Sequence, residues 1–147
     1  MTGQAAGPMW PSASPPRAGD GPTWDLSDVA ELPAVRAQLR RHVAERARGD
    51  DADSSDLREH LVLALDEMAS NALRHGGGRV RASVRLTEDA YLIEVSDAAT
   101  SAPPTPAIGR DPSEGGLGLY LIAELATEHG WYVSHGAKHV WALLPRG

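Results

Sequence analysis

Apolar and polar positions follow a helical period in the first half of the chain. Residues 32–49 and 56–75 repeat apolar side chains every three or four positions, which is the pattern of an amphipathic helix. In the second segment the apolar positions fall in one arc about 140° wide on a helical wheel, as expected for a face turned toward a core. These positions are Leu61, Ala64, Leu65, Met68, Ala69 and Ala72. The two segments therefore predict two helices, each with one buried face.

A period of two follows the glycines at residues 76–78. Residues 80–86 alternate apolar with polar side chains, and residues 91–96 alternate in a similar way. Because only residues 87–90 separate these segments, they predict a β-hairpin. Trp24 and Leu26 indicate a short strand earlier in the chain, while residues 131–133 and 140–144 indicate two closing strands around a turn at residues 135–138.

Three further segments complete the pattern. Residues 115–129 begin with glycines, continue at helical spacing and stop before Gly130, so they predict a third helix. Residues 98–114 have no hydrophobic period and contain four prolines, and we interpret this long loop as a lid. Residues 1–22 are rich in proline, glycine, alanine and serine. They predict a disordered tail, because this composition buries too little apolar surface to offset its ordering entropy.

The order of these elements predicts an α/β (α+β) two-layer sandwich over residues 23–147. Three helices would cover one face of a mixed, mostly antiparallel sheet. The 147-residue chain has an ordinary length for one domain with a single core, and it shows no internal repeat.

Composition excludes several classes of protein. A formal net charge of -6 argues against a surface for nucleic-acid phosphates. The absence of cysteine excludes disulfides and thiolate metal sites. No apolar run approaches the about 20 residues of a membrane span, and the N-terminus lacks the pattern of a signal peptide. We therefore expect a cytoplasmic protein with no direct nucleic-acid or membrane partner.

Two polar residues on the second predicted helix suggest chemistry. Glu67 and Asn71 are four apart, so on a helix their side chains project within about 40° of each other, at the edge of the apolar arc. Asp97 ends a predicted strand on the same parity as its apolar residues. Its carboxylate would therefore point toward the side that the helices cover, where a charge needs a partner or a ligand.

The glycines at residues 115, 116 and 118 open the third predicted helix. A helix N-terminus without side chains lets a phosphate approach backbone N–H groups, and the helix dipole favours its charge. The same glycines also suit a tight turn and close helix packing. Neither a P-loop nor a dinucleotide-binding fingerprint is present.

Other side-chain groups have two interpretations each. The first predicted helix carries an arginine cluster that is either a solvated face or a docking patch for an acidic partner: Arg36, Arg40, Arg41, Arg46 and Arg48. His135 and His139 are four apart, but across a predicted turn, which argues against a metal site. Trp131 and Trp141 fit the core better than a ligand-stacking role.

Taken in order, these motifs resemble the GHKL superfamily of ATP-binding proteins. That superfamily includes gyrase, heat-shock chaperones, histidine kinases and mismatch-repair ATPases. Residues 67–76, EMASNALRHG, are similar to its N-box; residues 95–97, VSD, to the start of its first glycine box; and residues 116–119, GLGL, to its second. The similarity is strongest to small actinobacterial anti-sigma factors with a stand-alone serine kinase domain, and it covers residues 24–145. It implies a Bergerat-type ATP-binding fold.

The resemblance also implies roles for individual residues. Glu67 would be catalytic and would orient or deprotonate the attacking hydroxyl. Asn71 would coordinate a Mg²⁺ that bridges the ATP phosphates, and Asp97 would accept a hydrogen bond from the adenine amino group. The other implied ATP-binding residues are His75, Gly76, Gly115, Gly116, Leu117, Gly118 and Leu119.

By resemblance, the chain is an ATP-dependent serine/threonine kinase and anti-sigma factor. It would bind a sigma factor, phosphorylate an antagonist protein and form a homodimer. The alternative is a non-catalytic binding module that keeps the fold and switches partners, either with or without a bound nucleotide. Residues 98–102 contain no glycine where the family usually has one, and Glu114 stands where many relatives begin the second glycine box. A histidine-kinase fragment is disfavoured, because no dimerising helix with a phospho-acceptor histidine precedes the domain.

Overall fold

The computed structural model describes residues 10–46, 54–101, 104 and 117–146, and the structural statements that follow concern these residues. Five strands form one sheet in the order β1-β2-β3-β5-β4. Their bounds are Thr23–Leu26 for β1, Val80–Leu86 for β2, Ala90–Asp97 for β3, Glu128–Ser134 for β4 and Ala137–Pro145 for β5. Every neighbouring pair is antiparallel.

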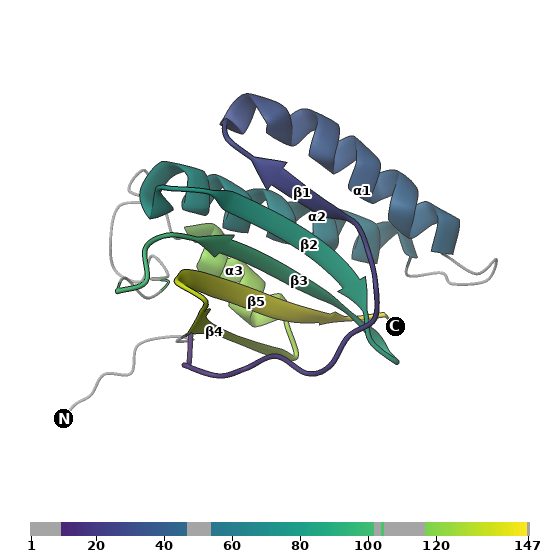
Figure 1. Cartoon of the computed structure of the whole chain (residues 1–147). Helices are drawn as coiled ribbons and strands as arrows, with labels where there is room; N and C mark the ends of the chain where they lie inside the picture. The colour runs from purple at the N-terminus through teal and green to yellow at the C-terminus, as the bar shows by residue number, and fades with distance from the viewer. Residues whose placement is uncertain (1–9, 47–53, 102–103, 105–116, 147) are drawn as a thin grey trace.

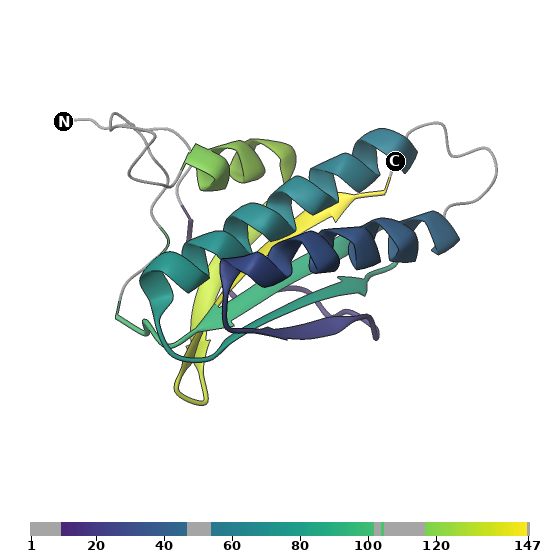
Figure 2. The same cartoon turned by 90° about the horizontal axis from the view of Figure 1, so that it is seen from above.

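Three α-helices cover one face of this sheet (Figures 1 and 2). They are α1 (Leu32–Arg46), α2 (Ser54–Asn71) and α3 (Leu117–Leu125), and a short 3-10 helix, η1 (Val29–Glu31), precedes α1. The predicted two-layer fold is therefore confirmed. The described strands pair only in antiparallel fashion, and the parallel element is an isolated bridge between Ser12 and Trp131.

The main core lies between the helices and the sheet. Leu61, Leu65 and Met68 on α2 are buried there, as the helical arc predicts. Alternate residues of β3 and β5 meet them from the sheet, among them Ile93 and Ala142. The predicted hairpin of β2 and β3 is confirmed, with Val84 paired to Ile93.

Element ends differ from the sequence prediction at three places. The α-helical hydrogen bonding of α2 stops at Asn71, and a π-helical turn, η2 (Ala72–Gly76), completes the predicted segment. Helix α3 stops at Leu125, and β4 has already begun at Glu128. The final turn contains only His135 and Gly136, which both have positive φ, so Lys138 belongs to β5.

Gly130 is not a helix stop but a strand residue. A Cβ at this position would lie 3.0 Å from the carbonyl oxygen of Pro11 and 3.0 Å from Cζ2 of Trp141. The glycine therefore allows two distant segments to approach the β4 backbone, which is a long-range requirement that local helix signals do not reveal.

Residues 10–22 are ordered against the sheet, contrary to the predicted tail; residues 1–9 lie outside the described part of the chain. Trp10 is buried, with its ring centroid 4.8 Å from that of His129. The indole Nε1 of Trp141 donates to the carbonyl of Ala13 at 2.8 Å, on the face opposite the helices. Figure 1 shows this segment, the N-terminal strap, running from the edge at β4 to β1. The burial of tryptophan and the backbone hydrogen bonds stabilise this segment, although its composition offers little apolar surface to bury.

No helix among the described residues is long and apolar enough to cross a membrane.

Candidate functional site

Glu67 on α2 faces the first turn of α3. Its side chain is partly buried, and the α3 residue against it is Gly118. A Cβ at position 118 would lie 2.4 Å from Cγ and 2.4 Å from Oε2 of Glu67. Only a glycine lets the two helices place this carboxylate so close to the N-terminal turn of α3, so Glu67 and Gly118, which are 51 positions apart in the sequence, are in contact.

The environment of Glu67 raises the pKa of its carboxyl. Burial is the main cause that raises the pKa of this carboxyl above its ordinary value, and the neighbouring charge of Asp66 raises it further. Arg74 opposes both effects. A carboxylate made more basic in this way is suited to accept a proton, which is the property that a general base needs.

Asn71 is half-buried at the end of α2, where the helix changes to the π-turn η2. It makes no side-chain capping hydrogen bond at the start of η2. The π-turn is held on one side by Arg74, whose Nη2 donates to Oγ of the buried Ser70 at 2.8 Å. Single π-turns inside helices are frequent at functional sites because they redirect the side chains that follow. His75, one of the predicted nucleotide contacts, is exposed on this turn.

Asp97 ends β3 on the helix-facing side of the sheet, as its parity predicts. It is only 4% exposed, and its Oδ1 accepts the backbone N–H of Ala99 at 2.8 Å. Gly76 closes the other side: a Cβ there would lie 2.3 Å from Cγ of Asp97. The end of η2 and the end of β3 are therefore in direct contact, and the backbone N–H of Ala98 also donates to the carbonyl of Gly77 at 3.2 Å.

Lys138 is a site residue that the sequence analysis missed. It lies on β5 directly opposite Asp97, and its Nζ is 3.5 Å from Oδ2 of that carboxylate. Both side chains are buried. One signal was available: of the 14 lysine and arginine residues in the chain, Lys138 is the only lysine.

The structure thus gathers two clusters at one end of α2. Glu67 and Gly118 form the first, while Asp97, Gly76 and Lys138 form the second, and Asn71 lies between them along the helix. Over the nine residues from Glu67 to Gly76, a helix advances about 13 Å, so the clusters are neighbours without touching.

Several predicted site residues do not join these clusters. Gly115 and Gly116, most of the predicted lid at residues 98–114, and the side chain of Leu117 lie outside the described residues. Leu119 is 2% exposed and packs in the core, so its side chain serves the fold and not a ligand. A nucleotide contact at Leu119 stays a prediction, and it concerns the backbone N–H of this residue in the first turn of α3.

Two arginines of the α1 cluster, and His139 on β5, contact acidic side chains elsewhere in the fold. Arg36 and Arg40 on α1 form ion pairs with Asp66 and Glu59 on α2, which makes this part of the arginine cluster an interhelical contact. On the sheet face opposite the helices, His139 Nδ1 lies 2.8 Å from Oε2 of Glu94.

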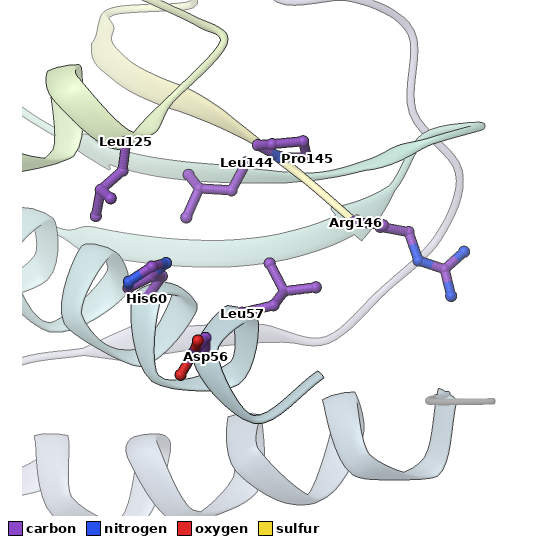
Figure 3. A pocket seen from close by; sticks show the side chains of 7 residues that line it. All are labelled: Asp56, Leu57, His60, Leu125, Leu144, Pro145 and Arg146. Atoms are coloured by element: carbon purple, nitrogen blue, oxygen red, sulfur yellow. The ribbon is translucent and has the colours of Figure 1, made fainter. Parts of the chain in front are cut away.

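A pocket of about 270 Å³ lies at the opposite end of α2. Figure 3 shows its lining, which joins the first turns of α2 to the ends of α3 and β5: Asp56, Leu57, His60, Leu125, Leu144, Pro145 and Arg146. It shares no residue with the predicted nucleotide site.

Comparison with known proteins identifies a family and a relative. The profile of the histidine kinase-like ATPase domain matches residues 26–143. The alginate biosynthesis sensor protein KinB of Pseudomonas aeruginosa is 29% identical over 128 residues, which cover 75% of this chain and 21% of that protein. The chain thus corresponds to a small part of this sensor protein. The matched profile spans every helix and strand from α1 to β4 and nearly all of β5.

Proposed function

Because the chain belongs to the histidine kinase-like ATPase domain family, we propose that it binds ATP with Mg²⁺ and phosphorylates a partner protein on serine or threonine. Family membership implies ATP binding. The observation that carries the catalytic part of the proposal is the contact between Glu67 and Gly118. It sets a carboxylate of raised pKa beside the N-terminal turn of α3, where phosphates bind favourably.

Glu67 acts as the general base in this proposal. Its carboxylate takes the proton from the acceptor hydroxyl as the hydroxyl oxygen forms a bond to the γ-phosphorus, while the bond between that phosphorus and the β–γ bridging oxygen breaks and ADP leaves. Gly118 contributes by keeping the carboxylate and the α3 backbone amides close together. Bound Mg²⁺ would supply neutralisation of the phosphate charge.

The other residues hold the nucleotide in place. The carboxamide oxygen of Asn71 suits Mg²⁺, which prefers oxygen ligands and completes its shell with phosphate oxygens and water. Asp97 would accept a hydrogen bond from the adenine amino group. The close contact of Gly76 with Asp97 supports this role, because it fixes the carboxylate at the end of the sheet.

The regulatory part of the proposal rests on the resemblance of the N-box and both glycine boxes to actinobacterial anti-sigma factors. The chain would bind a sigma factor, and its phosphoryl acceptor would be a small antagonist protein. A homodimer is part of the same proposal.

One observation favours a second candidate, a partner-switching module without phosphoryl transfer. Residues 98–102, which follow Asp97, lack the glycines that would let the backbone pass close to a base. We expect the adenine base to be held less closely at this end of β3.

Calorimetric titration with ATP and Mg²⁺ is the first test of the kinase, because the partner-switching module does not require nucleotide. If ATP binds, phosphotransfer to antagonist proteins encoded nearby tests the kinase. Glu67→Gln should abolish transfer and spare binding, whereas Asp97→Asn should weaken binding itself. Glu59→Gln is the matched control, because it removes an exposed carboxylate on the same helix. Unchanged transfer in Glu67→Gln would remove Glu67 from the chemistry, and absent binding at millimolar ATP would refute the kinase.

A further inference from the structure

We propose that Lys138 is a positioning residue for nucleotide binding, whose side-chain nitrogen holds the Asp97 carboxylate in the orientation that meets the base. This inference rests on the proposed function, in which Asp97 accepts the adenine amino group. It assigns a role to the single lysine of the chain.

The backbone register brings the two residues together. Asp97 on β3 and Lys138 on β5 are directly opposed in an antiparallel pair, so their side chains leave the same face of the sheet. Their side chains are 5% and 7% exposed, and Nζ lies 3.5 Å from Oδ2. This pair is therefore buried beside α2 and η2, where the helices cover the sheet, and it differs from a solvated surface ion pair.

Burial gives the pair its energetic weight. A carboxylate taken out of water is costly unless a cation and hydrogen bonds compensate it. Lys138 supplies the cation at Oδ2, and the backbone N–H of Ala99 supplies a hydrogen bond at Oδ1. Each carboxylate oxygen has a second lone pair, so the group can still accept a hydrogen bond from a ligand. Without Lys138, Oδ2 of Asp97 would lose a buried partner that holds the side chain in place.

Contact with Gly76 limits where the carboxylate can turn. The glycine lies so close that a Cβ would come within 2.4 Å of Oδ2 and 2.6 Å of Cβ of Asp97. The carboxylate is thus held by Gly76, by Ala99 and by Lys138. A group fixed in this way before binding loses little entropy when the ligand arrives, which increases affinity.

Lysine also fits this position better than arginine. The ammonium group is compact and meets one carboxylate oxygen as a point charge, whereas a guanidinium presents a planar fork that needs more partners. The chain has 14 lysine and arginine residues, and the 13 besides Lys138 are all arginine. The single exception occurs at the buried carboxylate that the proposed function assigns to the base.

A double-mutant cycle with ADP and Mg²⁺ as the ligand tests the inference by calorimetry. Lys138→Met and Asp97→Asn should each raise the Kd by about tenfold, the usual effect of losing a charge-assisted hydrogen bond. The double variant Asp97→Asn with Lys138→Met should bind no more weakly than Asp97→Asn alone, since Lys138 acts through Asp97. Unchanged binding in Lys138→Met, or multiplied effects in the double variant, would overturn the inference.

Two controls separate positioning from folding and from the proposed function. Arg41→Met removes an exposed cation on α1 and should leave the Kd unchanged. Melting curves show which variants fold. If Lys138→Met alone unfolds, comparison of the double variant with Asp97→Asn still tests whether Lys138 acts through Asp97. If the wild-type protein binds no ADP, the proposed function is refuted. If the wild-type protein binds ADP and Lys138→Met has the same Kd, only the inference is refuted. In phosphotransfer, Lys138→Met should raise KM for ATP and leave kcat unchanged.

The single lysine allows a direct measurement on the wild-type chain. Protein labelled with ¹⁵N and ¹³C in lysine alone gives one ε-methylene signal in NMR spectra. That signal should shift when ADP saturates the protein, and the shift should be lost in Asp97→Asn. A lysine signal that saturating ADP leaves unmoved would contradict a role at the base.

Discussion

Gly118 lies against the carboxylate of Glu67 so closely that a methyl group in its place would come within 2.4 Å of Oε2. Oε2 is the free end of a flexible side chain, which can rotate away at little cost to the fold. The space beside the first turn of α3 therefore holds either a side chain at position 118 or the carboxylate of Glu67 in its present position, but not both.

Substitution Gly118→Ala should accordingly disable catalysis without unfolding the protein. The new methyl group displaces the Glu67 carboxylate, and we expect the phosphotransfer rate to fall at least about tenfold, within the usual contribution of a general base. Single-turnover transfer and thermal melting measure the two effects. Gly19→Ala is the control, because a Cβ there meets only Leu86 O at 3.6 Å. A fully active Gly118→Ala would contradict the importance of this contact.

Substitution Gly76→Ala should affect nucleotide binding. Here the added methyl group would meet Cβ and Cγ of Asp97, at 2.6 Å and 2.3 Å. The Cβ of Asp97 is fixed to the backbone of β3 and does not move when the side chain rotates, so the end of η2 or of β3 must shift. We expect ADP affinity to fall at least as far as in Asp97→Asn, together with a lower melting temperature. Retention of wild-type affinity would show that the contact does not fix the carboxylate.

The phosphotransfer rate should fall on acidification, because Glu67 must be ionised to accept a proton. Its pKa is raised above the ordinary value of 4.5, chiefly by burial and then by Asp66, so the loss should begin at a higher pH than for an exposed glutamate. Asp66→Asn should move the midpoint of kcat/KM to lower pH, and Arg74→Met should move it to higher pH. A midpoint that neither variant moves would indicate that another group titrates.

The N-terminal strap should contribute measurably to stability. Trp10 is 5% exposed and packs on His129, so Trp10→Ala should lower the free energy of unfolding by about 3 kcal/mol, as for other buried tryptophans. Urea unfolding measures the change. The exposed Val29, 49% accessible, supplies the control in Val29→Ala, which should change stability by less than about 0.5 kcal/mol. Equal effects of the two substitutions would mean that the strap does not support the fold.

The periodicity of apolar residues predicts the structure correctly where an element packs against elements close to it along the chain. The face of α2 and the pairing of β2 with β3 follow from side-chain spacing. The direction of Asp97 follows from its parity with Ile93 and Val95, because a strand alternates its faces strictly. Glu67 and Asn71 could be paired for the same reason, since helical geometry fixes their separation.

The missed features all depend on contacts between distant segments. Gly130 resembles a helix stop until Pro11 and Trp141 are placed beside it. The strap has a disordered composition, and only the burial of Trp10 reveals its order. Lys138 becomes a site residue through the register of β5 on β3, which neither strand specifies alone.

The strap also constrains the order of events in folding. Ala13 receives its hydrogen bond from Trp141, 128 residues later in the chain, and Trp10 packs on His129. The hydrogen bond closes a loop of 128 residues, and the entropy of closing so long a loop favours formation of local contacts before it. On the ribosome, the strap must therefore wait until residue 141 has been made before all of these partners exist.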